Sequence, residues 1–217
     1  MRKLKQKIKL ESKNALIGQY GGNDSLDFEG EFEVIEKHQG KYAKSIGHLI
    51  ISFSFLEDVV DKDLATSINE RAYEPGYRII KYLEFRNKID LLRDQYAHYI
   101  KVCCVRHKKE KLLSELHVIY LKLIELSEFR NKIAHANWAS LDKAGFVRYQ
   151  AKEDRGSEAG GMIFEKFKMT PSVVLKFIRQ NQAVSSKIDL FREKVWEAAR
   201  LEQYRLYKQG EKEKKRN

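Results

Sequence analysis

The sequence predicts an all-α fold, an up-and-down bundle of about four long helices with a small β-hairpin inserted before the last one. Apolar residues recur at three- and four-residue steps over several long segments, the spacing of one buried helix face. The 217 residues include only 2 prolines, and 34% of them are charged, a composition that favours long helices. A chain of this length can bury a substantial core.

We divide the chain into an N-terminal extension (1–37), a helical domain (38–209) and a basic tail (210–217). The extension begins basic, becomes acidic after Gly21 and Gly22, and contains at most one short helix; it either caps the fold or covers the site. The first long helix is expected from about residue 40 to residue 69. Its predicted buried face is formed by Leu49, Phe53, Leu56, Val60 and Leu64.

Two further helices follow at short intervals, which favours up-and-down packing. Residues 74–76 contain a proline and a glycine and predict a turn. The second helix then carries an apolar seam of Phe85, Ile89, Leu92, Tyr96 and Tyr99. The basic cluster at 106–109 marks the next corner, and the third helix begins near Glu110. Its seam is formed by Leu112, Leu116, Ile119, Leu123 and Leu126.

The period of the apolar residues changes after the third helix. Residues 146–149 and 162–167 are rich in β-forming residues and flank a polar, glycine-rich stretch, which predicts a β-hairpin over about 145–169. Thr170 and Pro171 then supply an N-cap and a first-turn proline for the last helix. That helix is expected to run to about Tyr207, with apolar positions at Val174, Ile178, Ile188, Phe191 and Val195.

A charged side chain interrupts the seam of the third helix. The two positions that follow Leu126 in the same register are Arg130 and Ile133, so an arginine stands where an apolar residue is expected. A charge that faces the interior is costly unless it is paired, and such a placement indicates a site or an interface. His135 follows five positions later and is the residue type that exchanges protons near neutral pH. We therefore identify Arg130, Asn131 and His135 as the candidate catalytic residues.

This run resembles the motif of the HEPN family, an arginine followed by a polar residue and then, a few positions later, by a histidine. The resemblance covers the motif and the helical layout over about residues 40–206. It implies a metal-independent endoribonuclease that acts as a homodimer with two facing motifs and works without a cofactor. Such enzymes are often toxins or antiviral defence proteins that an inhibitory partner holds in check.

The residue types suit that chemistry. His135 would transfer the proton of the RNA 2′-hydroxyl group, and Arg130 would hold the phosphate oxygens through its planar guanidinium. Asn131 would orient the histidine or donate to the phosphate. The products would end in a 2′,3′-cyclic phosphate or 3′-phosphate and in a 5′-hydroxyl. The sequence shows no carboxylate cluster suited to two metal ions, and we predict no metal site.

On a straight helix, residues five positions apart point about 140° away from each other. Arg130 and His135 therefore converge only if the helix breaks near His135, or if a second copy of the chain completes the site.

A second arginine-histidine pair with the same spacing competes with the first. Arg93 and His98 match the pattern, but Arg93 lies one step off the apolar seam of its helix. We interpret this pair as a solvated flank that contacts RNA at most, and we place Lys132 in the same class of weak RNA contacts. Residues 85–89 repeat the letters of residues 129–133, but Leu91 stands where the histidine would be.

The residues also permit plain structural roles. Arg130 would then form an ion pair to a neighbouring helix, and His135 would cap a helix end. Trp138 and Trp196 are expected in the core or at an interface.

Charge and composition give the remaining expectations. A formal net charge of +11 favours a polyanionic partner such as RNA. No stretch approaches the roughly 20 apolar residues that a membrane span needs, and the adjacent cysteines, Cys103 and Cys104, agree with a reducing compartment, so we expect a cytoplasmic protein. A hypothesis from another class is a non-catalytic helical module that binds RNA or protein, or that dimerises.

Overall fold

The computed structural model describes residues 12–16, 28–68, 73–141, 145–154 and 161–214. Contacts divide the chain into two compact units. One comprises residues 1–49 and 130–176, and the other comprises 50–129 and 177–217. We call them the sheet unit and the helical unit. Their boundaries fall within helices α1 (Phe28–Ile68), α4 (Arg106–Ala134) and α5 (Pro171–Lys214).

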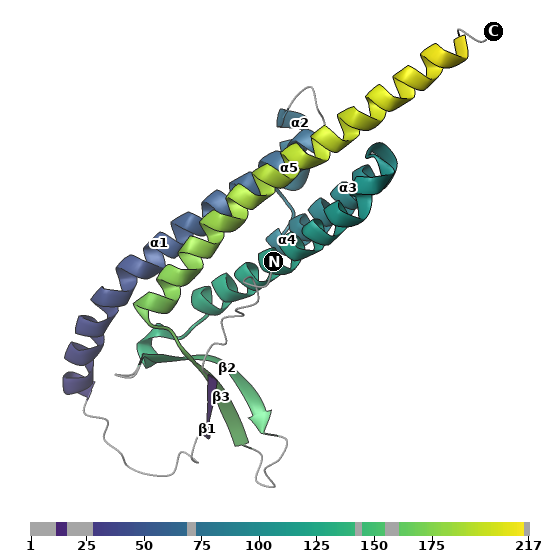
Figure 1. Ribbon diagram of the computed structural model, residues 1–217. Coiled ribbons are helices and arrows are strands. Elements are labelled where there is room, and N and C mark those ends of the chain that lie inside the picture. Colours follow the sequence, from purple (N-terminus) through teal and green to yellow (C-terminus); the bar gives the residue numbers. More distant parts are fainter. Residues whose placement is uncertain (1–11, 17–27, 69–72, 142–144, 155–160, 215–217) are drawn as a thin grey trace. The chain divides into compact units, whose positions relative to one another are not determined.

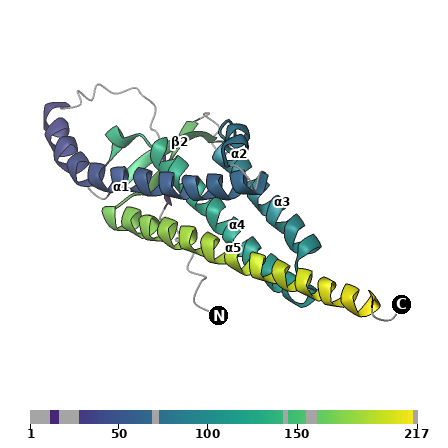
Figure 2. The same ribbon diagram turned by 90° about the horizontal axis from the view of Figure 1, so that it is seen from above.

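The helical unit contains the predicted bundle. Long stretches of α1, α4 and α5 pack with α3 (Phe85–Cys103), and the short α2 (Tyr73–Ile80) joins α1 to α3 (Figures 1 and 2). The all-α prediction with four long helices is confirmed for the described residues. None of the described helices has a segment long and apolar enough to span a membrane.

The predicted seams form the core of this bundle. The seam residues of α1 and α4 are buried, and in α5 Ile188, Phe191 and Val195 are buried as well. Aromatic rings join the helices in pairs, because Phe53 of α1 meets Phe85 of α3 edge to face, and Tyr96 of α3 meets Phe191 of α5 in the same way. Apolar spacing therefore located the buried faces of α1 and α4, whereas in α3 the aliphatic seam residues Ile89 and Leu92 are buried and the aromatic ones are half-buried.

Polar side chains also cross between helices inside the bundle. The Lys88 ammonium of α3 lies 2.8 Å from the Asp61 carboxylate of α1, and both side chains are only 11% exposed. On the other side of α3, the Tyr120 hydroxyl of α4 donates to Asp90 at 2.9 Å. The buried pair fixes how α1 and α3 align, because separating it would leave a charge without a partner.

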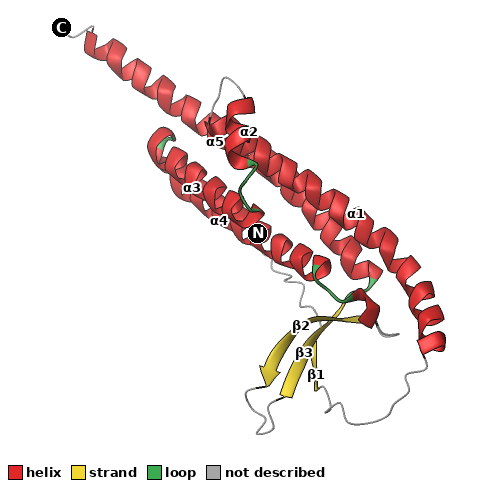
Figure 3. Ribbon diagram, turned by 180° about the vertical axis from the view of Figure 1, so that it is seen from behind, coloured by secondary structure: helices red, strands yellow, loops and turns green. Residues whose placement is uncertain are grey.

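The sheet unit contains a three-stranded antiparallel sheet in the order β1-β3-β2, drawn in yellow in Figure 3. The predicted hairpin is present as β2 (Phe146–Asp154) and β3 (Gly161–Lys168), with an irregular register between Arg148 and Ala151. The third strand is β1 (Ser12–Leu16), which pairs with β3. We did not predict it, because a five-residue strand with polar residues has no alternation that separates it from a loop.

Several predicted bounds need correction. Helix α1 begins at Phe28 rather than near residue 40, so part of the predicted extension is helical. Helix α4 begins at Arg106, which puts the basic cluster in its first turn and the corner at Cys104 and Val105. Helix α5 runs past Tyr207 to Lys214 and takes in most of the predicted tail. Residues 1–11 and 17–27 of the extension, the hairpin tip at 155–160 and residues 215–217 lie outside the described residues.

The predicted turn at residues 74–76 is also wrong, because these residues lie in α2. Pro75 is tolerated there since it occupies the first helical turn, where its missing N–H group costs nothing. Gly76 is required by packing, because a Cβ atom at this position would overlap the backbone of Ala65. The glycine thus allows α2 to approach α1 closely rather than ending a helix.

Candidate functional site

The candidate catalytic residues lie at the C-terminal end of α4. The predicted register continues to this point, because Phe129 and Ile133 are buried on either side of Arg130. Within the helical unit, the Phe129 ring stacks on Phe177 with centroids 3.2 Å apart. Arg130 itself is half-buried, whereas Asn131 and His135 are exposed.

A helix break near His135, one of the two alternatives that the sequence left open, is present. Helix α4 ends at Ala134, and the His135 amide still donates to the Asn131 carbonyl at 3.0 Å. A short 3-10 helix, η1 (Trp138–Ser140), follows after a turn. The Trp138 indole donates to the Ile133 carbonyl at 3.0 Å and so satisfies one of the last carbonyls of α4.

The segment after His135 is also tied to the sheet. The Asn137 amide donates to the Arg148 carbonyl of β2 at 2.8 Å, and Ser140 Oγ accepts from the Arg148 amide at 2.8 Å. His135 therefore stands on a turn that is held on one side by α4 and on the other by β2. A rigidly held turn presents an exposed imidazole in a defined place, as a catalytic base requires.

Arg130 and Asn131 interact with each other. Arg130 Nη1 donates to Asn131 Oδ1 at 3.2 Å, so the asparagine orients the guanidinium. That Asn131 orients the histidine or donates to the phosphate stays a prediction. A guanidinium carries five N–H donors in a planar fork, the geometry that suits phosphate oxygens.

Lys132 is engaged inside the sheet unit. Its ammonium lies over the Phe167 ring of β3, 4.4 Å from the centroid, in a cation–π contact. The side chain is half-buried. This contact gives Lys132 a packing role between the end of α4 and β3.

The second arginine-histidine pair has a different setting, within the length of α3. Arg93 Nε donates to Asp94 at 2.8 Å, its guanidinium also lies 3.5 Å from Asp90, and it covers the Tyr120 ring. The hydrogen bond to Asp94 holds the pKa of Arg93 above its ordinary value and lowers the pKa of Asp94. Arg93 is thus paired within the helical unit. Residues 85–89, which repeat the letters of residues 129–133, also have structural roles. Lys88 belongs to the buried pair with Asp61, and Arg86 contacts Asp90.

A cavity of about 690 Å³ lies in the helical unit, and sequence reasoning did not find it. Its walls come from the last turns of α1, from the middle of α3 and from α5. The lining residues are Asp63, Thr66, Ser67, Asp94, Gln95, Tyr96, His98, Tyr99, Arg192 and Trp196. His98, the histidine of the second pair, therefore borders a cavity rather than a bare surface.

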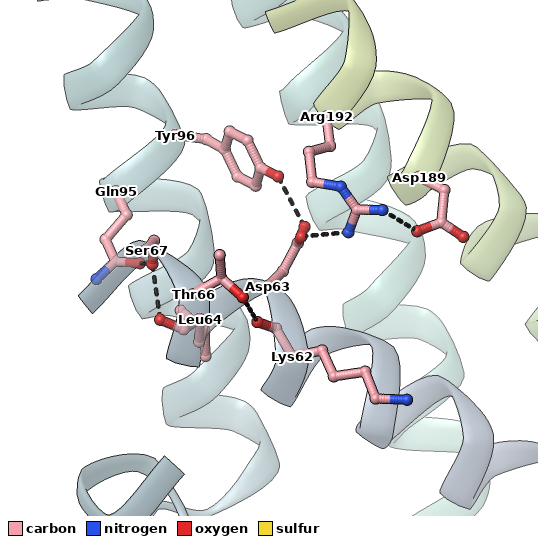
Figure 4. Close-up of polar contacts among 9 residues, drawn as sticks. All are labelled: Lys62, Asp63, Leu64, Thr66, Ser67, Gln95, Tyr96, Asp189 and Arg192. Atoms are coloured by element: carbon pink, nitrogen blue, oxygen red, sulfur yellow. Dashed lines mark hydrogen bonds and ion pairs between the residues drawn. The ribbon is translucent and has the colours of Figure 1, made fainter. Parts of the chain in front are cut away.

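Asp63 is the centre of the polar wall (Figure 4). Its side chain is 3% exposed and accepts two hydrogen bonds, from the Tyr96 hydroxyl at 2.7 Å and from Arg192 at 2.6 Å. Arg192 donates its other terminal nitrogen to Asp189 at 2.8 Å. Each charge in this wall is thus matched by an opposite charge, as a buried carboxylate requires.

The pKa values of the wall follow from this arrangement. Burial raises the pKa of Tyr96 well above its ordinary value, and the neighbouring Asp63 carboxylate raises it further. Burial alone would lower the pKa of Arg192, but the bond to Asp63 and the charges of Asp63 and Asp189 raise it by more. Tyr96 is therefore a neutral hydrogen-bond donor, and Arg192 keeps its positive charge.

One signal for this wall was present in the sequence. Asp61 and Asp63 stand among buried residues of α1, where apolar residues predominate, and Asp63 pairs with Arg192 129 positions later. No local spacing reports a pairing over that distance.

Among the described residues no three His, Cys, Asp or Glu side chains cluster so that they could hold a metal ion. The two cysteines are free thiols, and burial raises the pKa of Cys104.

Comparison with known proteins gives no relative: no protein-family model matches the chain, and neither a curated protein nor a solved structure is significantly similar to it. The resemblance to the HEPN family therefore rests on the motif and on the helices that carry it.

Proposed function

We propose that the protein is a metal-independent endoribonuclease of the HEPN type, with Arg130, Asn131 and His135 as its catalytic group. The observation that carries the proposal is the placement of this group at the end of α4. Arg130 stands just before the last turn, and the exposed His135 is the first residue after the helix. A net charge of +11 agrees with an RNA substrate.

Each residue has a part in the reaction. His135 accepts the 2′-hydroxyl proton as that oxygen attacks the adjacent phosphorus, and a histidine also returns a proton to the departing 5′-oxygen. Arg130 stabilises the charge that grows on the non-bridging oxygens. Asn131 positions Arg130 through the 3.2 Å bond between them.

One imidazole does not act as base and acid at the same moment, so a second group is needed. We propose that two copies of the chain bring two Arg130–His135 pairs to one site, which makes dimerisation a condition for activity. One histidine is then the base while its counterpart is the acid. The protons balance, because the one taken from the 2′-hydroxyl is replaced by the one given to the 5′-oxygen.

The test is cleavage of an end-labelled RNA in excess EDTA by the wild-type protein and by His135→Ala, with the product ends analysed. A matched strand with deoxyribose at every position is the substrate control, because it lacks the attacking hydroxyl. The proposal predicts cutting that survives EDTA, spares the deoxy strand, leaves cyclic phosphate ends and disappears in the variant.

Light scattering on the same samples reports whether each protein is a dimer. A folded, dimeric wild type that cuts no RNA would contradict the proposal. It would favour a non-catalytic helical module that binds RNA or a protein.

A further inference from the structure

The cavity of the helical unit has no part in the proposed cleavage reaction. Its volume of about 690 Å³ lies within the range of small-molecule sites, roughly 300–1,000 Å³. It is lined by three helices of one unit, and it combines aromatic rings with polar side chains. Sites of that composition bury the apolar part of a ligand against aromatic side chains and fix its orientation with a few hydrogen bonds.

The charges of the wall restrict the ligand to a neutral one. Both carboxylate oxygens of Asp63 accept charge-assisted bonds, and Asp94 accepts from Arg93. Arg192 gives one terminal nitrogen to Asp63 and the other to Asp189. An ammonium ion would have to compete for occupied carboxylates, and a phosphate would have to compete for an occupied guanidinium.

The aromatic residues favour a planar ligand. Trp196 lies one helical turn after Arg192 on α5 and is 48% exposed, although a tryptophan normally buries most of its ring. Tyr99 lines the cavity from α3. An indole at the edge of a cavity is a stacking partner for a flat ring, and stacking of bases on aromatic side chains is a large part of single-stranded nucleic-acid affinity.

The remaining polar groups supply both donors and acceptors. Gln95 accepts from Ser67 through Oε1, so its two Nε2 hydrogens are the donors it offers to a ligand. Ser67 donates its single proton within the protein, which leaves its oxygen lone pairs as acceptors. A ring that carries both kinds of group at its edge matches this pattern.

We propose that this cavity binds a nucleobase, stacked on Trp196 and hydrogen-bonded at its edge by Gln95 and Ser67. A nucleobase is neutral, planar and edged with donors and acceptors. The base reaches the cavity either as a free nucleoside or as part of a single RNA strand, and in both cases its phosphates stay outside. None of the residues that line the cavity belongs to the proposed catalytic group.

The test is calorimetric titration of the full-length protein with the four ribonucleosides, their 5′-monophosphates and a single-stranded RNA. We expect at least one nucleoside to bind, with an affinity that the 5′-phosphate and added salt change by less than about threefold. Trp196→Leu should weaken binding about tenfold or more, from the size of a lost stacking contact, and Trp196→Phe should restore part of it. Gln95→Ala should weaken it about threefold to tenfold, from the loss of a hydrogen bond.

Two controls separate this site from other effects. Tyr204→Leu removes another exposed aromatic ring of α5, 62% exposed and outside the cavity, and should leave binding unchanged. His135→Ala lies outside the lining of the cavity and should bind the nucleosides as the wild type does, so loss of cleavage and loss of nucleoside binding are independent results. The proposal is overturned if no nucleoside and no RNA binds, if Trp196→Leu binds as well as the wild type, or if spermidine or inorganic phosphate displaces the nucleoside.

Discussion

Two segments of the chain carry an arginine followed five positions later by a histidine, and the structure gives them different surroundings. Arg93 and His98 lie within α3, where the guanidinium is paired with Asp94 and Asp90 and covers Tyr120. Arg130 and His135 lie on the two sides of the end of α4. The same spacing therefore occurs once inside a helix and once across a helix end.

The difference teaches that spacing alone does not define a catalytic pair. Inside a helix, residues five apart diverge by about 140°, and nothing in α3 changes their directions. At the end of α4 the chain leaves the helix at His135, and contacts with Ile133 and Arg148 hold the turn. We therefore expect chemistry from the second segment and stability from the first, and each prediction below compares them.

The largest difference is expected between the two histidines. His135→Ala should lower the RNA cleavage rate about 10³-fold, within the range for loss of a general acid–base group. His98→Ala should leave the rate within about threefold, because His98 borders the cavity of the helical unit. Initial rates on one labelled RNA measure both. A larger loss with His98→Ala would reverse the assignment of the two segments.

The next comparison concerns stability and two lysines, Lys88 and Lys132, which occupy the same place in the matching stretches 85–89 and 129–133. Lys88→Ala should reduce the free energy of unfolding by about 3 kcal/mol or more, because it leaves the Asp61 carboxylate buried without its partner. Lys132→Ala removes a cation–π contact with Phe167 and should cost about 1 kcal/mol. Urea denaturation measures both values.

Lys88→Met with Asp61→Leu is the matched control for this pair. It should recover much of the loss, because two apolar residues replace two charges. If Lys88→Ala were as stable as the wild type, the buried pair would have no part in aligning α1 with α3.

The two arginines should differ more modestly when each is changed to lysine. Arg130→Lys keeps the charge but loses the planar fork, and we expect the cleavage rate to fall roughly 10- to 30-fold with little change in stability. Arg93→Lys should leave the cleavage rate unchanged, because Arg93 pairs within the helical unit. Circular dichroism establishes that both variants are folded. Equal rates for wild type and Arg130→Lys would leave the guanidinium without a catalytic role.

The helices could be predicted because their signals are local. The seam from Leu112 to Leu126 lies on one face of α4, and Ile133 continues it past Arg130. Strand β1 and the start of α1 at Phe28 could not be predicted, because a five-residue strand and a polar first turn have no strong periodicity.

The functional residues also include some that the sequence predicts and some that it does not. The arginine on the apolar seam is visible in the sequence, and so is the histidine that follows it. The cavity is not, because its wall joins Asp63 to Tyr96 and to Arg192 across three helices. Only folding brings such residues together, and a single sequence does not report which distant residues meet.

The smallest effect is expected from Tyr96, two residues before His98, and it tests the structural role of the α3 segment. The folded protein holds the pKa of Tyr96 above its ordinary value of about 10, mainly because the phenol is buried. Below pH 10 both folded and unfolded states keep the proton, so this group adds no pH dependence. Above pH 10 the unfolded chain loses the proton and the folded chain keeps it, so stability falls as the pH rises.

Tyr96→Phe removes this dependence together with the bond to Asp63. At pH 7 we expect a loss of about 1 kcal/mol from the missing hydrogen bond. Between pH 10 and 11 the wild type should lose stability faster than the variant, by up to about 1.4 kcal/mol per pH unit, the value for one proton. The two unfolding curves therefore approach each other as the pH rises. Parallel curves would mean that the Tyr96 hydroxyl is as accessible to water in the folded protein as in the unfolded chain, and the polar wall around Asp63 would then have to be open to solvent.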